Sequence, residues 1–263
     1  MIKKNFIKLL IFCLILPFFN TILFCDETAK KVWYFNPDNN NQSSEIIKFS
    51  SEYFQIIKSP IEIQPITKID ALIEQLNLKH VNHIIISKIF ENALNINNSF
   101  NRKLIAENEK NESSYKKKLI TRKSNADKIK TFSGIKIACS SYGKISETIL
   151  TGLFSGDNLN FSDASVIWVK RDLDAFFALT LDQVDASVVS QATLDFIQKE
   201  NPDNLSDITI TNVSSDIQLP SLYIENNNSD MKVVCDDFLK MNDDKNAKDT
   251  FKILGISKWK EIK

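Results

Sequence analysis

The chain alternates short apolar runs with amphipathic segments, and this alternation constrains its fold more than any other feature. Short apolar runs of strand length stand at residues 32–35 and 83–86, and residues 61–65 alternate apolar and polar side chains as a strand does. The segments between them, at residues 44–57 and 67–78, repeat apolar residues at helical spacing. Strands that alternate with helices predict an α/β fold with mostly parallel sheets.

A second series with the same plan follows further along the chain. An extended segment at residues 114–122 leads into it, and a strand at residues 208–211 leads back. The elements expected between them are strands at 135–138, 164–168 and 184–189 and helices at 143–154, 172–182 and 190–199. One α/β unit inserted into another predicts two lobes with mixed, mostly parallel sheets, joined by two crossings. The expected bounds are 32–117 plus 214–263 for lobe 1 and 118–213 for lobe 2.

Three further segments have a distinctive composition. Residues 95–114 are rich in Asn, Lys and Glu and predict a long surface loop around one irregular strand. Residues 230–262 predict helices, with Gly255 at a cap. The run Lys116–Lys118 predicts the exposed side of an edge strand, where lysines oppose association between sheets.

The first 25 residues have the pattern of an export signal. Lys3 and Lys4 precede an apolar run at residues 9–19 that is shorter than a membrane-spanning helix. Cys25 stands where a bacterial lipoprotein is acylated, although the bulky Phe24 before it departs from the small residue usual there. Lipidation of Cys25, ordinary cleavage nearby and an uncleaved anchor are the three alternatives. Each of them predicts a periplasmic or other extracytoplasmic location.

Composition and motifs argue against several classes of function. The 263 residues carry 33 basic and 33 acidic side chains, whereas nucleic-acid-binding proteins usually present a basic surface. The sequence has no nucleophile elbow, phosphate-binding P-loop or dinucleotide fingerprint, and His80 and His83 have no third metal ligand nearby. Cys139 and Cys235 stand in segments expected to be buried, which favours free thiols. We therefore expect a protein without metal or cofactor that is not an enzyme. We also expect a monomer.

Several short motifs follow one another in a particular order between residues 32 and 259. They are Tyr115 before an apolar strand that ends in Arg122-Lys123-Ser124, Gly134–Ala138 before the serine loop Ser140–Gly143, Asp182–Ala186 before a strand, and Leu254-Gly255 before Trp259. In order and spacing they resemble the phosphonate-binding-like (phosphate, phosphite and phosphonate) substrate-binding proteins of ABC transporters. The resemblance implies a type 2 periplasmic-binding fold, a small anionic solute and a membrane permease as partner.

The chain departs from that family at positions that hold the ligand. The family's loop commonly reads Ser-Thr-Ser-Gly, and its third hydroxyl is replaced here by Tyr142. An acidic residue that some members place near Ala192 is also absent. A second one, expected near Gln218–Pro220, is absent unless Asp216 serves in its place. The resemblance therefore extends to the fold better than to the identity of the ligand.

The physical chemistry of the serine loop also favours binding of an anion, independently of the resemblance. The strand at residues 135–138 runs into Ser140, Ser141, Tyr142 and Gly143, where a helix is expected to begin. A helix N-terminus offers unpaired N–H groups and about half a positive charge. The serine hydroxyls would add donors, and Gly143 would let a ligand approach closely. The alternative is that one of the serines only caps the helix.

Four residues elsewhere complete the expected ligand site. Phe35 and Ser87 follow the first and third strands, at the edge where open α/β sheets bind ligands. Phe35 could instead pack in the core, and Ser87 could instead cap the next helix. The resemblance implies that Arg171 and Ser190 also face the ligand, each after a strand of the second series.

These observations predict an extracytoplasmic solute-binding protein of an ABC transporter. Its two lobes would close on a small anion, and the closed form would dock on the permease. The alternative is a ligand sensor without a transport role, or a degenerate envelope lipoprotein with the same fold. The missing acidic residues favour that alternative.

Overall fold

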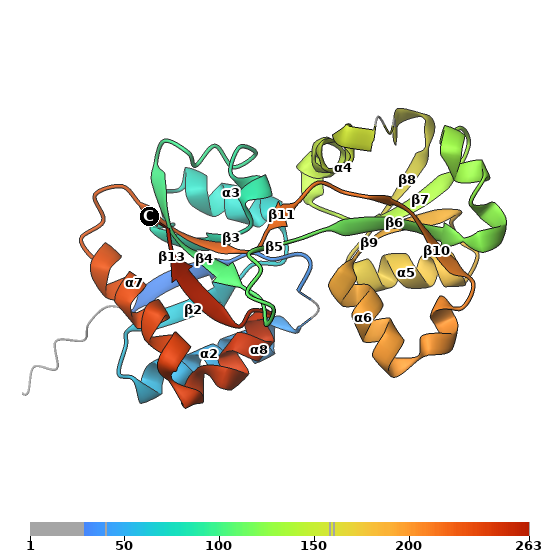
Figure 1. Ribbon diagram of the computed structural model, residues 1–263. Helices are drawn as coiled ribbons and strands as arrows, with labels where there is room; N and C mark the ends of the chain where they lie inside the picture. Colours follow the sequence, from blue (N-terminus) through green and yellow to red (C-terminus); the bar gives the residue numbers. More distant parts are fainter. Residues whose placement is uncertain (1–28, 40, 158, 160, 263) are drawn as a thin grey trace, which may run out of the picture.

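The computed structural model describes residues 29–39, 41–157, 159 and 161–262, and Figure 1 shows that they form two units side by side. The first unit, called lobe 1 from here on, is built around a six-stranded sheet. Its strands in spatial order are β13 (Lys258–Glu261), β4 (Phe100–Glu107), β12 (Ser221–Glu225), β3 (His83–Ile86), β1 (Lys30–Tyr34) and β2 (Ile61–Pro65). β2, β1, β3 and β4 run in one direction, while β12 and β13 run in the other.

The second unit, lobe 2, is built around a five-stranded sheet. Its strands in spatial order are β10 (Ile208–Val213), β6 (Lys117–Arg122), β9 (Ala186–Ser190), β7 (Lys136–Ser140) and β8 (Ser165–Val169). Only β6 runs against the others. Both sheets are therefore mixed, with most strands pointing one way, as the sequence predicts.

Helices cover both faces of each sheet. In lobe 1, the helices α2 (Ser43–Ile56), α7 (Met231–Lys240) and α8 (Lys248–Leu254) share one apolar cluster on one face, and α3 (Ile69–Asn77) packs on the other. In lobe 2, α5 (Asp172–Thr180) and α6 (Gln191–Glu200) share a separate apolar cluster, whereas α4 (Ser146–Leu153) packs on the opposite face. The cluster that contains α3 also contains α4, so one apolar core continues from lobe 1 into lobe 2.

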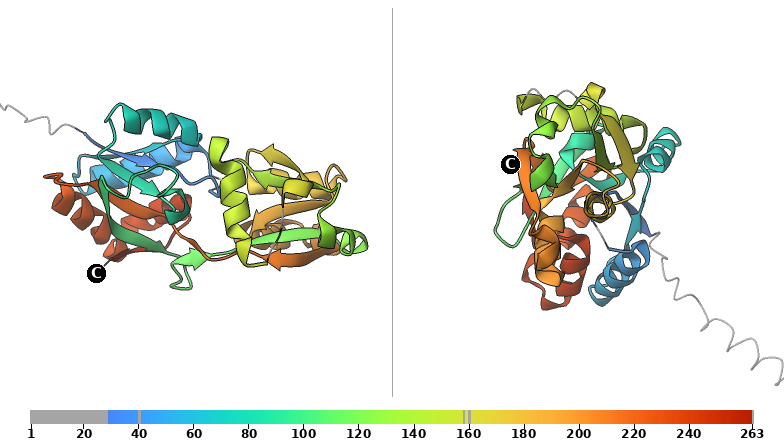
Figure 2. Two further views of the ribbon diagram at one scale, coloured as in Figure 1. Left: turned by 90° about the horizontal axis from the view of Figure 1, so that it is seen from above. Right: turned by 90° about the vertical axis from the view of Figure 1, so that its right-hand side faces the viewer.

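Two extended crossings join the lobes. The first carries β5 (Ser114–Tyr115) and leads into β6, and the second carries β11 (Ile217–Gln218) and follows β10. β5 and β11 pair in antiparallel fashion, so the crossings lie side by side between the two sheets. Figure 2 (left) shows the same two units from above, with the crossings running from one to the other.

The predicted α/β class and the architecture of two mixed sheets are confirmed, and three local expectations are wrong in whole or in part. The segment 95–114 is not mainly a surface loop, because β4 is an inner strand of eight residues. β4 is irregular, as expected, since its register against β12 shifts between Arg102 and Leu104. The end of the chain is not helical throughout, because Lys258–Glu261 form β13. Lys117 is not on an exposed edge: its strand β6 lies between β10 and β9, and its side chain is fully buried.

Other expectations concern the bounds of the lobes and the thiols. All strands from β6 to β10 that belong to the second sheet fall between residues 117 and 213, close to the expected bounds of lobe 2, and those bounds remain a prediction. Cys139 and Cys235 are free thiols. Cys25 and the export signal lie outside the described residues. Among the described residues, no helix is both long and apolar enough to cross a membrane.

Candidate functional site

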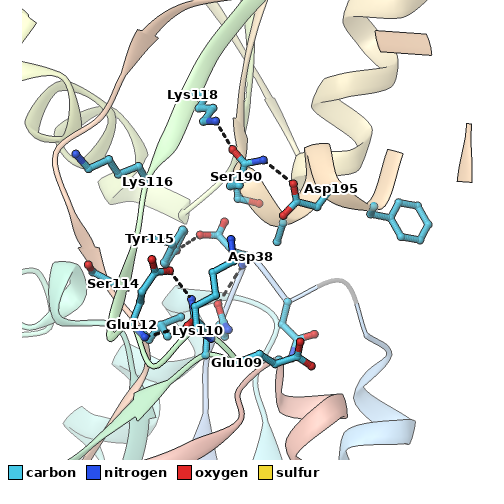
Figure 3. Close-up of a pocket in the computed structure, with 18 of the residues that line it drawn as sticks. Asp38, Glu109, Lys110, Glu112, Ser114, Tyr115, Lys116, Lys118, Ser190 and Asp195 are labelled. Atoms are coloured by element: carbon cyan, nitrogen blue, oxygen red, sulfur yellow. Dashed lines mark hydrogen bonds between the residues drawn. The ribbon is translucent and has the colours of Figure 1, made fainter. Parts of the chain in front are cut away.

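A cavity of about 920 Å³ lies between the lobes, beside the crossings. Lobe 1 contributes the loop after β1 and the turn between β4 and β5, and lobe 2 contributes the first residues of α6. Figure 3 shows residues from both lobes and from the first crossing around this space. Its size and position suit a small molecule held between two bodies.

The cavity wall carries charges of both signs. Its lining includes five carboxylates and three lysines, namely Asp38, Glu109, Glu112, Asp195 and Asp216 and Lys110, Lys116 and Lys118. Some of them are paired: Lys118 donates to the side chain of Gln191, whose amide donates to Asp195 at 2.6 Å. Lys116 Nζ lies 3.7 Å from Asp216. The wall therefore offers contacts to positive and to negative groups of a ligand.

Asparagines in the wall hold the loop after β1 in place. The side-chain amides of Asn39 and Asn41 both donate to the carbonyl of Ile253, at 2.9 and 2.8 Å. Ile253 lies in the last turn of α8, where helix carbonyls have no partner within the helix. These contacts fix the loop so that Asp38 reaches the junction of the two lobes.

At that junction, beside the cavity, lies the buried side chain of Lys117. Its ammonium group donates to Asp38 of lobe 1 at 2.7 Å and to Ser140 and Asp172 of lobe 2, both at 2.9 Å. These three bonds use all three N–H groups of the ammonium. The ammonium also lies 5.2 Å from the ring centroid of Tyr142, within the range of a cation–π contact.

The carboxylates around Lys117 have further donors. Tyr115 on the first crossing donates its hydroxyl to Asp38, and the backbone N–H of Ser190 donates to Asp172 at 2.7 Å. Burial alone would lower the pKa of Lys117, but Asp172 and Asp38 outweigh it and raise that pKa well above its ordinary value. Burial raises the pKa of Asp38, while the charge of Lys117 acts in the opposite direction. Lys117 is therefore a buried, fully bonded cation at neutral pH.

The serine loop does not present free amides to the cavity. The N–H of Ser141 donates to the carbonyl of Val169 at 2.8 Å, that of Tyr142 to the hydroxyl of Ser146 at 2.7 Å, and that of Gly143 to the hydroxyl of Ser141 at 3.2 Å. The helix also begins later than expected, since a 3-10 turn at Gly143–Ile145 precedes α4. The loop amides that would bind an anion thus have partners within lobe 2.

The same loop forms the apolar contact between the lobes. Tyr142 is buried and packs edge-on against Phe90 of lobe 1, with ring centroids 5.5 Å apart. Phe90 packs in the same way against Phe35 at 5.1 Å, which places Phe35 in the core. Gly143 adopts a φ of +64°, and a Cβ at this position would lie 2.8 Å from Ile69 Cγ2 at the start of α3. The two lobes therefore touch directly at the serine loop.

The other predicted residues have separate positions. Ser87 donates its hydroxyl to the carbonyl of Gln218 at 2.6 Å and so attaches the second crossing to the end of β3. Arg171 binds Asp174 of its own helix at 2.9 Å. Ser190 caps α6 by accepting from the N–H of Thr193 at 3.3 Å, and it is the one predicted site residue among those that line the cavity. The described geometry brings Ser140, Tyr142 and Ser190 near one another through the Lys117 cluster and leaves Arg171 apart.

Sequence reasoning missed the residues of the Lys117 cluster, namely Lys117, Asp38, Tyr115 and Asp172. Lys117 stood in a lysine run whose composition predicted exposure. Asp38 and Asp172 were signalled only by position, since each follows a strand at the edge where ligands usually bind. No group of metal-ligating side chains able to hold an ion occurs among the residues that the structure describes.

Together, two α/β lobes, paired crossings and a cavity at their junction define the type 2 periplasmic-binding fold. Comparison with solved structures supports this class. A binding protein component of an ABC phosphonate transporter from Pseudomonas aeruginosa is similar with a TM-score of 0.71 and 13% identity, over 89% of this chain and 82% of that one.

Two further solved structures are similar over 89% of this chain. A protein from Xanthomonas citri bound to ATP has a TM-score of 0.69 and 10% identity over 90% of its own length. A protein from Prochlorococcus marinus in complex with methylphosphonate has a TM-score of 0.66 and 10% identity over 92% of its length. No family model and no curated protein matches the sequence. At these identities, the comparisons establish the fold.

Proposed function

We propose that this chain is an extracytoplasmic solute-binding protein that holds a small ligand between its two lobes and delivers it to an ABC transporter permease. The observation that carries the proposal is the cavity of about 920 Å³ at the junction of the lobes, lined from both lobes and from the crossings. A ligand in that position contacts both lobes at once. Its binding energy therefore favours the arrangement in which they are close together.

We still propose an anionic ligand, but we propose that it contacts the cavity wall and not the serine loop. Lys110, Lys116 and Lys118 supply positive charge, and the first turn of α6 adds backbone N–H groups. The five carboxylates of the wall disfavour a simple anion. A ligand that carries an anionic group together with an ammonium or hydroxyl group suits this wall better.

Similar structures support a binding role over a catalytic one. One of them is named as a transporter binding protein, and others were solved with methylphosphonate or ATP bound. The cluster around Lys117 contains titratable groups, but all three donors of Lys117 are already used within the protein. We therefore propose transport rather than catalysis as the role of the fold.

A thermal-shift screen tests this proposal. The panel contains phosphate, phosphite, methylphosphonate, an aminoalkylphosphonate and a zwitterionic amino acid. A ligand at 100 times its dissociation constant adds about 2.7 kcal/mol of stability, which raises the melting temperature of a chain of this size by roughly 5–10 °C. We expect at least one anionic or zwitterionic compound to give such a shift. No shift for any member of the panel would contradict an anion-binding function.

A further inference from the structure

The ion cluster at the junction of the lobes has contributors from both lobes. Asp38 lies in lobe 1, after β1, whereas Asp172 lies at the start of α5 in lobe 2. Lys117 Nζ bonds to one oxygen of each carboxylate, at 2.7 and 2.9 Å. The side chains of Lys117 and Asp172 are fully buried, and that of Asp38 is 9% exposed. The cluster is therefore a largely buried ionic contact that ties the two lobes together.

The cluster occupies the place where this fold would otherwise hold a ligand. Ligands of open α/β sheets bind beyond the carboxyl ends of the strands. Here Asp38 follows β1, Ser140 ends β7, and Lys117 enters between them from the first residue of β6. An ammonium bonded by two carboxylates and a hydroxyl, and facing an aromatic ring, has the contacts that a protein gives to a bound amine.

We propose that Lys117 is a built-in cationic ligand of the inter-lobe site, which closes the two lobes on each other in the absence of any solute. In this arrangement a solute uses only the neighbouring cavity beside the crossings, and Lys117 excludes amines from the strand-end position. The inference goes beyond the proposed function, since it does not depend on what that cavity binds. It concerns the state of the protein before the ligand arrives.

The neighbouring contacts agree with a closed state that needs no solute. The serine-loop amides are paired within the protein, so they do not wait for an anion. Gly143 packs against α3, and Tyr142 packs against Phe90, on the apolar side of the same junction. Separation of the lobes takes Asp38 away from Lys117, and water must then replace the ammonium group at Asp38. Because breaking a buried ion pair is strongly disfavoured, this exchange favours the closed state.

Small-angle X-ray scattering of the ligand-free protein tests the proposal. We expect wild-type protein to have the radius of gyration calculated from the closed structure. Lys117→Ala leaves Asp38 and Asp172 unpaired in the site, so we expect a larger radius. Asp38→Asn weakens only the contact that reaches from lobe 1 and keeps the Lys117–Asp172 pair. We expect it to enlarge the radius too, so it provides the test if Lys117→Ala does not fold.

A matched control and a chemical rescue sharpen this test. Lys258→Ala removes another lysine from a buried carboxylate, since Lys258 lies 2.9 Å from Glu107 within lobe 1, and we expect an unchanged radius. Lys117→Ala removes three methylenes and an ammonium, which corresponds to n-propylammonium. Millimolar n-propylammonium should return this variant to the wild-type radius, whereas n-propanol and NaCl at equal concentrations should not.

The outcomes separate this inference from the proposed function. An extended wild-type protein without solute, or variants at Lys117 and Asp38 that stay as compact as the wild type, would overturn the role of Lys117 whether or not a solute binds. A compact wild type that binds none of the solutes tested would leave that role standing and overturn the proposed function.

Discussion

Gly143 is the residue at which the backbone of lobe 2 comes closest to α3 of lobe 1. Its φ of +64° is a conformation that glycine adopts freely, and its missing side chain makes room for Ile69. Gly134 has a similar φ of +71° but no heavy atom within 4 Å of an added Cβ. The two glycines share the same backbone requirement, and only Gly143 adds a contact between the lobes.

We therefore expect Gly143→Ala to lower the free energy of unfolding more than Gly134→Ala does. Both substitutions place alanine in the left-handed region, at a cost of about 1–2 kcal/mol. Gly143→Ala adds a contact of 2.8 Å with Ile69 Cγ2 and 3.1 Å with Asp70 Oδ2, which forces the lobes apart. Urea unfolding of the two variants measures the difference. Equal losses would mean that the lobes do not touch at Gly143 in solution.

For single residues of the site, the sequence predicts where a side chain lies better than what it contacts. Ser140 and Ser190 end strands at the junction of the lobes, and Tyr142 lies two residues after one, because the ends of strands can be located approximately from apolar runs. Their partners could not be predicted, since Lys117 looks like any member of a lysine run until the pairing of β6 is known. The direction of a side chain in a strand alternates with each residue, so a shift of one residue decides whether Lys117 or Lys118 is buried.

Among the elements, β13 shows how tertiary packing decides a segment that the sequence leaves ambiguous. Residues 258–261 are too short and too polar to predict a strand, but they pair with β4 at the edge of the six-stranded sheet. Trp259 in this strand is 2% exposed and packs edge-on against Phe238 of α7, with ring centroids 5.4 Å apart. β13 thus covers the edge of the sheet and closes the core under α7.

Trp259→Ala should reduce the free energy of unfolding by about 3–5 kcal/mol, because it opens a cavity in a packed core. Trp168→Ala is the matched comparison. Trp168 lies on the edge strand β8 and is 37% exposed, so we expect a markedly smaller loss. Chemical denaturation of both variants, followed by circular dichroism, measures the two values. A larger loss for Trp168→Ala would contradict the placement of β13.

The other elements could be predicted because their signals are local. β1, β3, β7, β8 and β9 each overlap a mainly apolar run, β2 an alternating segment and β6 an extended segment, and α2, α5 and α6 coincide with expected helices. β4 (Phe100–Glu107) is predicted only as an irregular strand within a surface loop, and its register against β12 does shift between Arg102 and Leu104. As an inner strand of lobe 1 it is held by pairing with β12 and β13, which come more than 100 residues later in the sequence.

For the whole molecule, the repeated plan of the sequence predicts two lobes, and the structure places one cavity and one ion cluster at their junction. The plan follows from chain topology, because a unit inserted into another must be entered and left by two crossings. The cavity depends instead on how closely the lobes approach. That distance is set by Gly143, Tyr142 and Lys117, whose contacts form only in the folded chain.

In our proposal, the cavity beside the crossings is the binding site of this protein. Ala192 is an exposed residue in the first turn of α6 and lines the cavity, so Ala192→Trp places a large side chain in part of that space. Ala93→Trp makes the same change at an exposed position of lobe 1 that does not line the cavity. Both variants keep the residues of the Lys117 cluster.

Isothermal titration calorimetry of these two variants and the wild type, with the compound that gives the largest thermal shift, tests whether the ligand binds in this cavity. We predict binding of one molecule per chain to the wild type and to Ala93→Trp, and a loss of at least about tenfold in affinity, equivalent to 1.4 kcal/mol, for Ala192→Trp. Unchanged affinity of Ala192→Trp would show that the ligand binds elsewhere and would contradict the account.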